Sequence, residues 1–340
     1  MNRIRYITIG LILAAVAIGA SGRLSAQAVP LDSTVPEVKT NREAKDVQTK
    51  LSLMEQEQFS QSQGVTFLTF LLQYGDHIRV QRFFYASGKD LVPGYVFTPL
   101  HLDKAKRYPA IVLVHGGFHA ELDWRWFDLI EAAVAKGYVV FFPEYHGSAG
   151  YGEGIYKNNY GTTDIADVLA GTEYLVKSRP YVDPARLAVV GHSRGGMLTL
   201  LAIEQAPKKF KAAVDIAGLS DFVAFMAYKP DWRRAETATD ERFGGKLPSE
   251  NLAPYLDISP VNHLDDIVTP LLIAATTGDK TNPLVLHVGR LVDGLRARNK
   301  TFELKVYDHA PGDHIFLFGD TDERRDLFDR IFAFLDKYMK

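Results

Sequence analysis

The sequence predicts an α/β fold with one open, mostly parallel β-sheet and helices on both faces. Two alternating, aromatic-rich segments, residues 77–86 and 91–99, flank Ser87-Gly88-Lys89-Asp90 and predict a β-hairpin. Beyond the hairpin, short apolar runs alternate with longer stretches of helical periodicity, as strands and helices do in parallel sheets. A serine between glycines, Ser193, joins one such run to the next helix. In open sheets of this kind, sites form beyond the carboxyl ends of the strands.

The elements after the hairpin follow from these two patterns. Short runs rich in Val, Ile and Leu predict strands at residues 110–115, 138–142, 187–190, 212–216, 271–275 and 301–307. Apolar residues spaced three or four apart predict helices at residues 127–136, 164–178, 195–206, 283–298 and 322–338. Residues 218–268 interrupt the alternation, and we expect them to form an insertion that passes over the site.

The first 28 residues have the pattern of a secretory signal peptide. Arg3 and Arg5 precede an apolar run over residues 7–20, and Ser25-Ala26-Gln27-Ala28 offers an A-x-A cleavage site. The apolar run is short for a membrane span, which needs about 20 residues, so an uncleaved anchor is the less favoured alternative. The sequence therefore predicts export to a periplasm or the medium, cleavage near Ala28 and no stable membrane anchoring afterwards.

Residues 29–75 form an N-terminal extension, and residues 76–340 form the domain that carries the chemistry. Within the extension, residues 50–59 and 65–72 have helical spacing. Such a segment either packs on the main domain or serves as a lid or a partner-binding element.

Composition excludes several functional classes. The chain has 340 residues, of which 46% are hydrophobic and 24% are charged, as in ordinary globular proteins. Its net charge of −2 gives no indication of a nucleic-acid partner. The absence of cysteine excludes a thiol nucleophile and Cys-ligated zinc. His115 and His119 have i, i+4 spacing but no evident third ligand, so we expect no metal and no cofactor. The sequence does not indicate an oligomeric state.

The segment Gly191-His192-Ser193-Arg194-Gly195 is a G-x-S-x-G pattern between a predicted strand and a predicted helix. In that context it predicts a nucleophile elbow, a sharp turn that exposes the serine hydroxyl above the sheet. A serine hydroxyl becomes a useful nucleophile only when a base takes its proton and an acid orients that base. The pattern therefore predicts an α/β-hydrolase fold with Ser193 as nucleophile.

The acid and the base are expected after Ser193, in that order. Asp279 follows the strand at residues 271–275 and is preferred over Asp293, which falls on a helix, and Asp313, which adjoins the base. The loop after the strand at residues 301–307 holds His309 and His314. His314 is preferred because His309 follows the strand too closely to reach back, although a flexible Pro-Gly loop keeps His309 as an alternative.

An oxyanion needs two preorganised N–H donors. We expect one from the backbone of Arg194 and the other from Gly117 or Phe118, in the glycine-containing loop after the first parallel strand. His115 and His192 are expected to be structural.

Substrate contacts are less sharply defined by the sequence. Asp231, Arg233 and Arg234 could recognise a charged substrate terminus, although a solvated surface run is the commoner role of such residues. Several aromatic residues are candidates for a substrate pocket, with core packing as the commoner role: Phe118, Trp124, Trp126, Phe222 and Phe225.

From about Gly88 onward the chain resembles the catalytic domain of the prolyl oligopeptidase family of serine peptidases. The resemblance rests on the elbow and on Tyr108-Pro109-Ala110, His115-Gly116-Gly117, Gly147-Ser148-Ala149-Gly150-Tyr151-Gly152, Asp183-Pro184-Ala185-Arg186, Arg242-Phe243-Gly244-Gly245, Ser259-Pro260-Val261 and Thr269-Pro270. It implies that Ser193, Asp279 and His314 are the family's triad.

The chain departs from the family pattern in two places. Members usually carry a β-propeller ahead of the hydrolase domain, and residues 29–75 are too few for one, so we expect no propeller. The residue after the serine, often Tyr in the family, is Arg194. We therefore expect a serine hydrolase that cleaves a peptide or another amide, with a carboxylesterase acting on small esters as the alternative. A non-catalytic binding module is a third, less favoured hypothesis.

Overall fold

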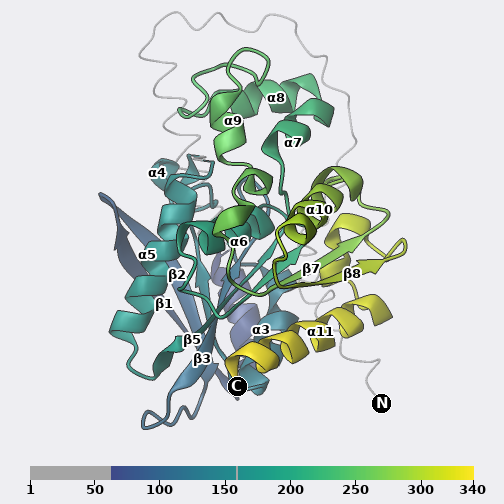
Figure 1. Ribbon diagram of the computed structural model, residues 1–340. Helices are drawn as coiled ribbons and strands as arrows, with labels where there is room; N and C mark the ends of the chain where they lie inside the picture. The colour runs from purple at the N-terminus through teal and green to yellow at the C-terminus, as the bar shows by residue number, and fades with distance from the viewer. Residues whose placement is uncertain (1–62, 158–159) are drawn as a thin grey trace, which may run out of the picture. The chain divides into compact units, whose positions relative to one another are not determined.

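The computed structural model describes residues 63–157 and 160–340. The expected signal peptide and the expected helix at residues 50–59 lie outside this part of the chain. All the described strands belong to one eight-stranded sheet with the order β1-β2-β4-β3-β5-β6-β7-β8 (Figure 1). The prediction of a single, mostly parallel sheet is thereby confirmed.

The sheet begins with the expected hairpin. Strands β1 (Ile78–Ser87) and β2 (Asp90–Pro99) pair antiparallel, and β2 also pairs antiparallel with β4. The remaining neighbours are parallel, and their strands are β3 (Tyr108–Val114), β4 (Val139–Pro143), β5 (Val182–His192), β6 (Ala212–Ile216), β7 (Leu271–Thr276) and β8 (Phe302–Tyr307).

Side chains alternate between the two faces along each strand, and each face has its own core. In β3, Val112 and Val114 join the core under α5 (Thr163–Ser178), α6 (Arg194–Gln205) and α10 (Arg290–Ala297). Ile111 and Leu113 join the core under α3 (Phe127–Ala135) and α11 (Asp322–Met339). Helices therefore cover both faces. The inner parallel strands are buried on both sides, whereas the edge strand β8 is partly exposed.

Two elements differ from the sequence prediction. Strand β5 begins five residues before the predicted residue 187, because Val182 pairs with Tyr108 ahead of an irregularity in the ladder. The predicted helix at residues 283–298 is interrupted: a π-helical turn, Val285–Gly289, precedes α10.

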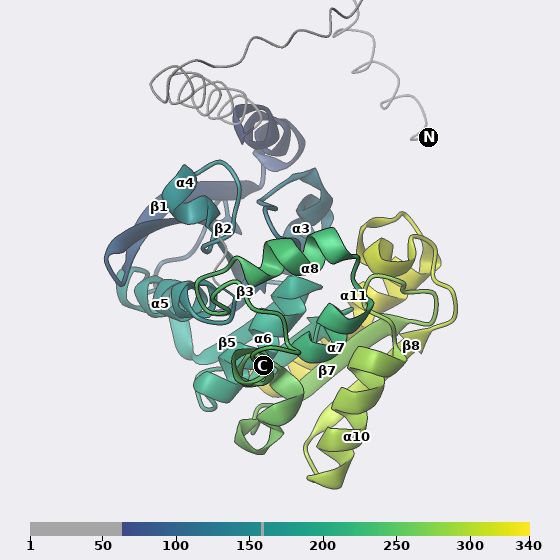
Figure 2. The ribbon, with the colours of Figure 1, turned by 90° about the horizontal axis from the view of Figure 1, so that it is seen from above.

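Residues between β6 and β7 form the helices α7 (Phe222–Tyr228), α8 (Asp231–Ala238) and α9 (Ala253–Asp257). Figure 1 places them together above α6, and Figure 2 views them from above. A further short helix, α4 (Glu153–Tyr156), was not predicted. Two 3-10 turns, Trp124–Trp126 and Asp313–Phe318, flank the cavity described below.

Residues 63–74 are helical and include the predicted helix at residues 65–72. Phe70 is buried edge-on against Phe97 and Phe127, with ring centroids 5.0 and 4.9 Å apart. This part of the extension therefore packs on the main domain. No helix among the described residues is long and apolar enough to cross a bilayer.

The contact between α5 and the sheet depends on a glycine. A Cβ on Gly171 would lie 2.7 Å from ring atoms of both Phe141 and Tyr85, whereas a Cβ on Gly154 of α4 would meet no atom within 4 Å. We expect Gly171→Ala to lower the free energy of unfolding by about 1–3 kcal/mol, because the added methyl group forces α5 or the rings to move. Gly154→Ala is the control and should cost nothing. Urea unfolding measures both, and equal stability of the two variants would contradict the prediction.

Candidate active site

Ser193 lies at a strained turn between β5 and α6. Its φ is 59° and its ψ is −118°, a conformation that non-glycine residues rarely adopt. A Cβ on Gly191 would overlap the carbonyl oxygen of Gly195, and a Cβ on Gly195 would overlap that of Val114. The Ser193 backbone N–H donates to Ile216 O at 2.9 Å, which fixes the turn to β6. The predicted elbow is therefore present in the structure, and its two glycines are sterically required.

His314 bridges Ser193 and Asp279. Its Nε2 lies 2.8 Å from Ser193 Oγ, and its Nδ1 lies 2.7 Å from Asp279 Oδ2. The other carboxylate oxygen of Asp279 accepts from the backbone N–H groups of Thr281 and Asn282, each at 2.8 Å. The structure thus brings the three predicted residues into one hydrogen-bonded chain.

The alternative residues lie elsewhere. His309 is exposed, and its backbone N–H donates to Thr277 Oγ1, whereas the ring that bonds to Ser193 Oγ is that of His314. Asp293 is an exposed residue of α10 paired with Arg296. Gly312, with a φ of 88°, turns the chain after β8 so that His314, five residues beyond His309, reaches the serine.

His192 supports the base from behind. Its ring is buried, and its Nε2–H donates to the backbone carbonyl of His314 at 2.7 Å. Burial is the main cause that lowers the pKa of His192, to about 3, so the ring stays neutral at ordinary pH. His192 therefore has a structural role, as expected: its hydrogen bond holds the backbone of His314 in place.

The expected oxyanion donors surround Ser193. Arg194 is the first residue of α6, so its N–H lies at a helix N-terminus. Gly117 and Phe118 line the same cavity as Ser193, and the loop comes so close to the elbow that a Cβ on Gly116 would lie 2.7 Å from His192 O.

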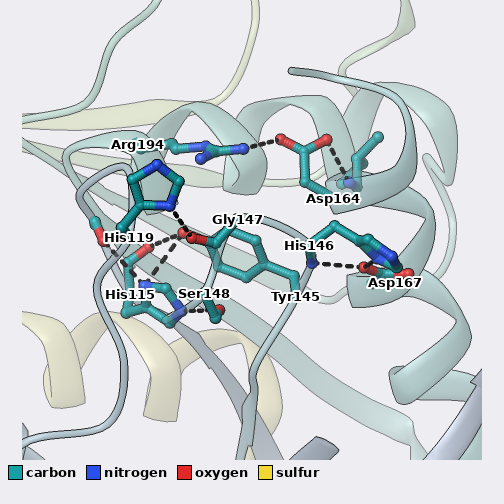
Figure 3. Close-up of polar contacts among 11 residues, drawn as sticks. His115, His119, Tyr145, His146, Gly147, Ser148, Asp164, Asp167 and Arg194 are labelled. Carbon is teal, nitrogen blue, oxygen red and sulfur yellow. Dashed lines mark hydrogen bonds and ion pairs between the residues drawn. The ribbon is translucent and has the colours of Figure 1, made fainter. Parts of the chain in front are cut away.

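A buried polar network holds this loop against the segment after β4 (Figure 3). His115 Nε2 lies 2.9 Å from Ser148 Oγ, and Tyr145 Oη donates to His115 O at 2.7 Å. His119 Nδ1 donates to Gly147 O at 3.0 Å. Both histidines are therefore committed to positioning the loop. Among the described residues, no group of three or more side chains could hold a metal ion.

The sequence did not predict the role of the Arg194 side chain. Its guanidinium donates to Asp164 Oδ2 at 2.8 Å, and the two side chains are 3% and 0% exposed (Figure 3). It also lies over the rings of Phe118 and Tyr160, 5.3 and 4.9 Å from their centroids. The residue after the nucleophile therefore ties the oxyanion loop to α5. The available signal was the position of this arginine. It directly follows the nucleophile at the start of a buried helix, and a buried guanidinium requires an acidic partner.

A cavity of about 300 Å³ opens at Ser193. Three of the aromatic residues considered as pocket candidates, Phe118, Trp126 and Phe225, line this cavity. Trp124 does not: it is 67% exposed on the outer side of its 3-10 turn. Phe222 does not either, because it is buried among other aromatic rings. Neither Trp124 nor Phe222 is therefore a pocket residue, and Phe222 has the core-packing role that was expected to be the commoner one.

A second correction concerns the charged run in α8. Arg233 lines the cavity, with its guanidinium 4.7 Å from the centroid of the Phe118 ring. Asp231 and Arg234 pair with each other one turn apart. The interpretation of the run as solvated surface therefore fails for Arg233, because α8 turns that side chain towards Ser193.

Comparisons with known proteins agree with this architecture. The model of the prolyl oligopeptidase family matches residues 125–340, which include Ser193, Asp279 and His314. The uncharacterized peptidase YuxL of Bacillus subtilis is 30% identical over 229 residues, covering 65% of this chain and 33% of that protein. The acylamino-acid-releasing enzyme of Arabidopsis thaliana is 29% identical over 253 residues, covering 72% of this chain and 32% of that enzyme.

Solved structures show the same fold. The acylaminoacyl peptidase of Pyrococcus horikoshii superposes with a TM-score of 0.66 at 21% identity, over 79% of this chain and 43% of that chain. A puromycin-hydrolyzing peptidase of Mycobacterium tuberculosis gives a TM-score of 0.64 at 24% identity, over 77% and 39%. The chain thus spans about a third of the length of the curated relatives it matches.

The pair between Arg194 and Asp164 allows a test of the positioning role. We expect Arg194→Met to lower the free energy of unfolding by about 3–5 kcal/mol, because Asp164 remains buried without its ionic partner. The control is Arg330→Met, which breaks an exposed pair with Asp326 and should cost at most about 1 kcal/mol. Urea unfolding measures both losses. If Arg194→Met cost no more than Arg330→Met, the buried pair would not hold the loop.

Proposed function

Because the chain belongs to the prolyl oligopeptidase family, we propose that it is a serine hydrolase that cleaves amide bonds with Ser193, His314 and Asp279. The observation that carries the proposal is the continuous chain of hydrogen bonds from Ser193 Oγ through the imidazole to the carboxylate, 2.8 and 2.7 Å long, at the wall of a cavity. A base and an acid aligned on a serine in a strained turn activate a nucleophile, which the alternative function of a non-catalytic binding module does not require.

The reaction proceeds by acyl transfer. His314 Nε2 accepts the Ser193 proton as Oγ attacks the substrate carbonyl, and Asp279 stabilises the imidazolium that forms. The developing oxyanion accepts hydrogen bonds from the N–H of Arg194 and from the N–H of Gly117 or Phe118. The C–N bond breaks as His314 returns the proton to the leaving amine. Water, activated by the same histidine, then hydrolyses the acyl-enzyme and restores the serine hydroxyl.

The names of the relatives indicate a substrate class. By their names, the acylamino-acid-releasing enzyme releases acylated amino acids and the acylaminoacyl peptidase acts on acylated aminoacyl groups. We propose that this chain also cleaves short peptides on the carboxyl side of an N-acylated residue. The same acyl transfer would hydrolyse small esters, so a carboxylesterase is the alternative function.

Kinetics on the purified protein test both functions. We expect N-acetyl-aminoacyl p-nitroanilides to be cleaved and Ser193→Ala or His314→Asn to lower kcat/KM by about 10⁴-fold or more, because the nucleophile or its base is lost. His309→Asn is the matched control and should leave kcat/KM within about 2-fold of wild type, a difference of only about 0.4 kcal/mol in ΔΔG‡.

The outcomes separate the hypotheses. Cleavage of p-nitrophenyl esters without cleavage of anilides would make the protein a carboxylesterase. Equal losses for His309→Asn and His314→Asn would contradict the proposed base. Turnover that survives Ser193→Ala would overturn the proposed mechanism.

We propose further that the protein is exported and cleaved after Ala28. The support is the basic start, the apolar run over residues 7–20 and Ser25-Ala26-Gln27-Ala28, all outside the described residues. Amino-terminal sequencing of protein recovered from the periplasm or medium of expressing bacteria should begin at Val29. Full-length protein retained in the cell would contradict the proposal.

A further inference from the structure

The cavity at Ser193 has a one-sided charge. Arg125, Lys229 and Arg233 line it together with the buried Arg194, and none of the described residues that line it is an aspartate or a glutamate. A cavity with cationic walls and no acidic group attracts negatively charged ligands.

The lining cations differ in how well they are neutralised. Arg194 is matched by Asp164, and Arg125 donates through Nε to Asp123 Oδ2 at 2.9 Å. Arg233 Nη1 lies 2.6 Å from Glu236 Oε2, but their side chains are 25% and 49% exposed, and such a pair contributes little.

Lys229 has no carboxylate within ion-pair distance in the part of the chain that the structure describes. Its Nζ donates to the carbonyl of Thr281 at 2.9 Å and lies 4.5 and 4.9 Å from the ring centroids of Phe225 and Tyr228. An ammonium group has three N–H donors, and the bond to Thr281 uses one of them.

The side chains of Lys229 and Arg233 are both held close to the proposed catalytic groups. The carbonyl of Thr281 that binds Lys229 also accepts from Tyr228 Oη at 2.9 Å, and the N–H of the same residue donates to Asp279. Arg233 lies over Phe118 of the oxyanion loop. Lys229 directly follows α7, and Arg233 lies in the first turn of α8. Pro230 and the start of α8 therefore connect two cations that border the same cavity.

The two cations also affect each other. Burial lowers the pKa of Lys229, and the nearby Arg233 lowers it further, while Asp279 opposes both effects. Two like charges beside a partly desolvated cavity are stabilised when an anion enters it. A carboxylate suits the site, because it can accept from the ammonium through one oxygen and from the planar guanidinium through the other.

We propose that Lys229 and Arg233 form a subsite for a carboxylate of the substrate, so that the enzyme prefers substrates with a negative charge next to the scissile bond. The inference rests on the proposed function, because it places this carboxylate in the cavity of Ser193. The carboxylate comes from an acidic side chain of the acylated residue or from the free terminus of a short leaving peptide.

Matched substrates test the subsite. N-acetyl-Glu and N-acetyl-Gln p-nitroanilides differ by one charge in the acyl part, and N-acetyl-Ala-Ala and its carboxyl-terminal amide differ by one charge in the leaving part. We expect kcat/KM to favour the charged member of one pair in the wild type. Lys229→Met and Arg233→Met should each lower that charged-to-neutral ratio by about 10- to 100-fold, as expected for a lost hydrogen bond to a charged group.

Arg234→Met is the control on the same helix. Arg234 pairs with Asp231 and does not line the cavity, so its replacement should leave the ratio unchanged. The pair that shows the preference identifies the source of the carboxylate. A wild-type ratio near one for both pairs, or a ratio that Lys229→Met does not change, would overturn the subsite while the proposed hydrolase function stands.

Binding decides the matter if no substrate is turned over. We would then measure two pairs of affinities by calorimetry, in the wild type and in Lys229→Met. One pair is N-acetylglutamate α-methylamide and N-acetylglutamine α-methylamide, and the other is N-acetyl-Ala-Ala and its carboxyl-terminal amide, measured on the Ser193→Ala background so that neither is consumed. Tighter binding of the charged compound that weakens in Lys229→Met and at high salt supports the subsite. Equal affinities within both pairs would refute it, whereas absent turnover alone contradicts only the proposed function.

Discussion

The close approach of α6 to the carboxyl ends of β3 and β5 is the constraint on which the site depends. At Gly191 and Gly195 there is no room for a side chain, so the chain must turn sharply and Ser193 must adopt a positive φ. The ladder that places Gly191 beside Val114 and Asp215 brings the ends of three parallel strands together there. Loops that leave neighbouring strands then supply the remaining groups, as they do in open sheets generally.

Local signals were enough to predict this frame. Alternating and helical periodicity located the strands and the major helices, and the chain order after Ser193 selected Asp279 and His314, which the structure joins by hydrogen bonds. Contacts between residues far apart in the sequence could not be predicted from these local signals. The partner of Arg194 is Asp164, thirty residues earlier, and nothing local to either residue indicates the other. The π-helical turn before α10, in which the N–H of Gly289 donates to Leu284 O at 2.8 Å, likewise has no signal in the spacing of the apolar residues.

Substrate contacts were the least predictable part, for a related reason. A strand fixes which face each side chain takes, whereas the helices between β6 and β7 can lie in many orientations over the sheet. Arg233 and Arg234 are neighbours in sequence, yet only Arg233 reaches the cavity. Trp124 and Trp126 differ in the same way, since one turn of 3-10 helix directs them to opposite sides. The orientation of these short helices therefore determines which residues meet a substrate.

The positive charge of the cavity also bears on the chemistry. The transition state of acyl transfer carries an oxyanion and an imidazolium, and nearby cations stabilise the first while they destabilise the second. In the proposed mechanism Asp279 offsets the charge of the imidazolium, whereas Lys229 and Arg233 line the cavity. A substrate carboxylate bound between these two cations would neutralise them as His314 becomes charged. We infer that such a group acts on kcat as well as on KM, because its benefit grows as the proton moves to the histidine.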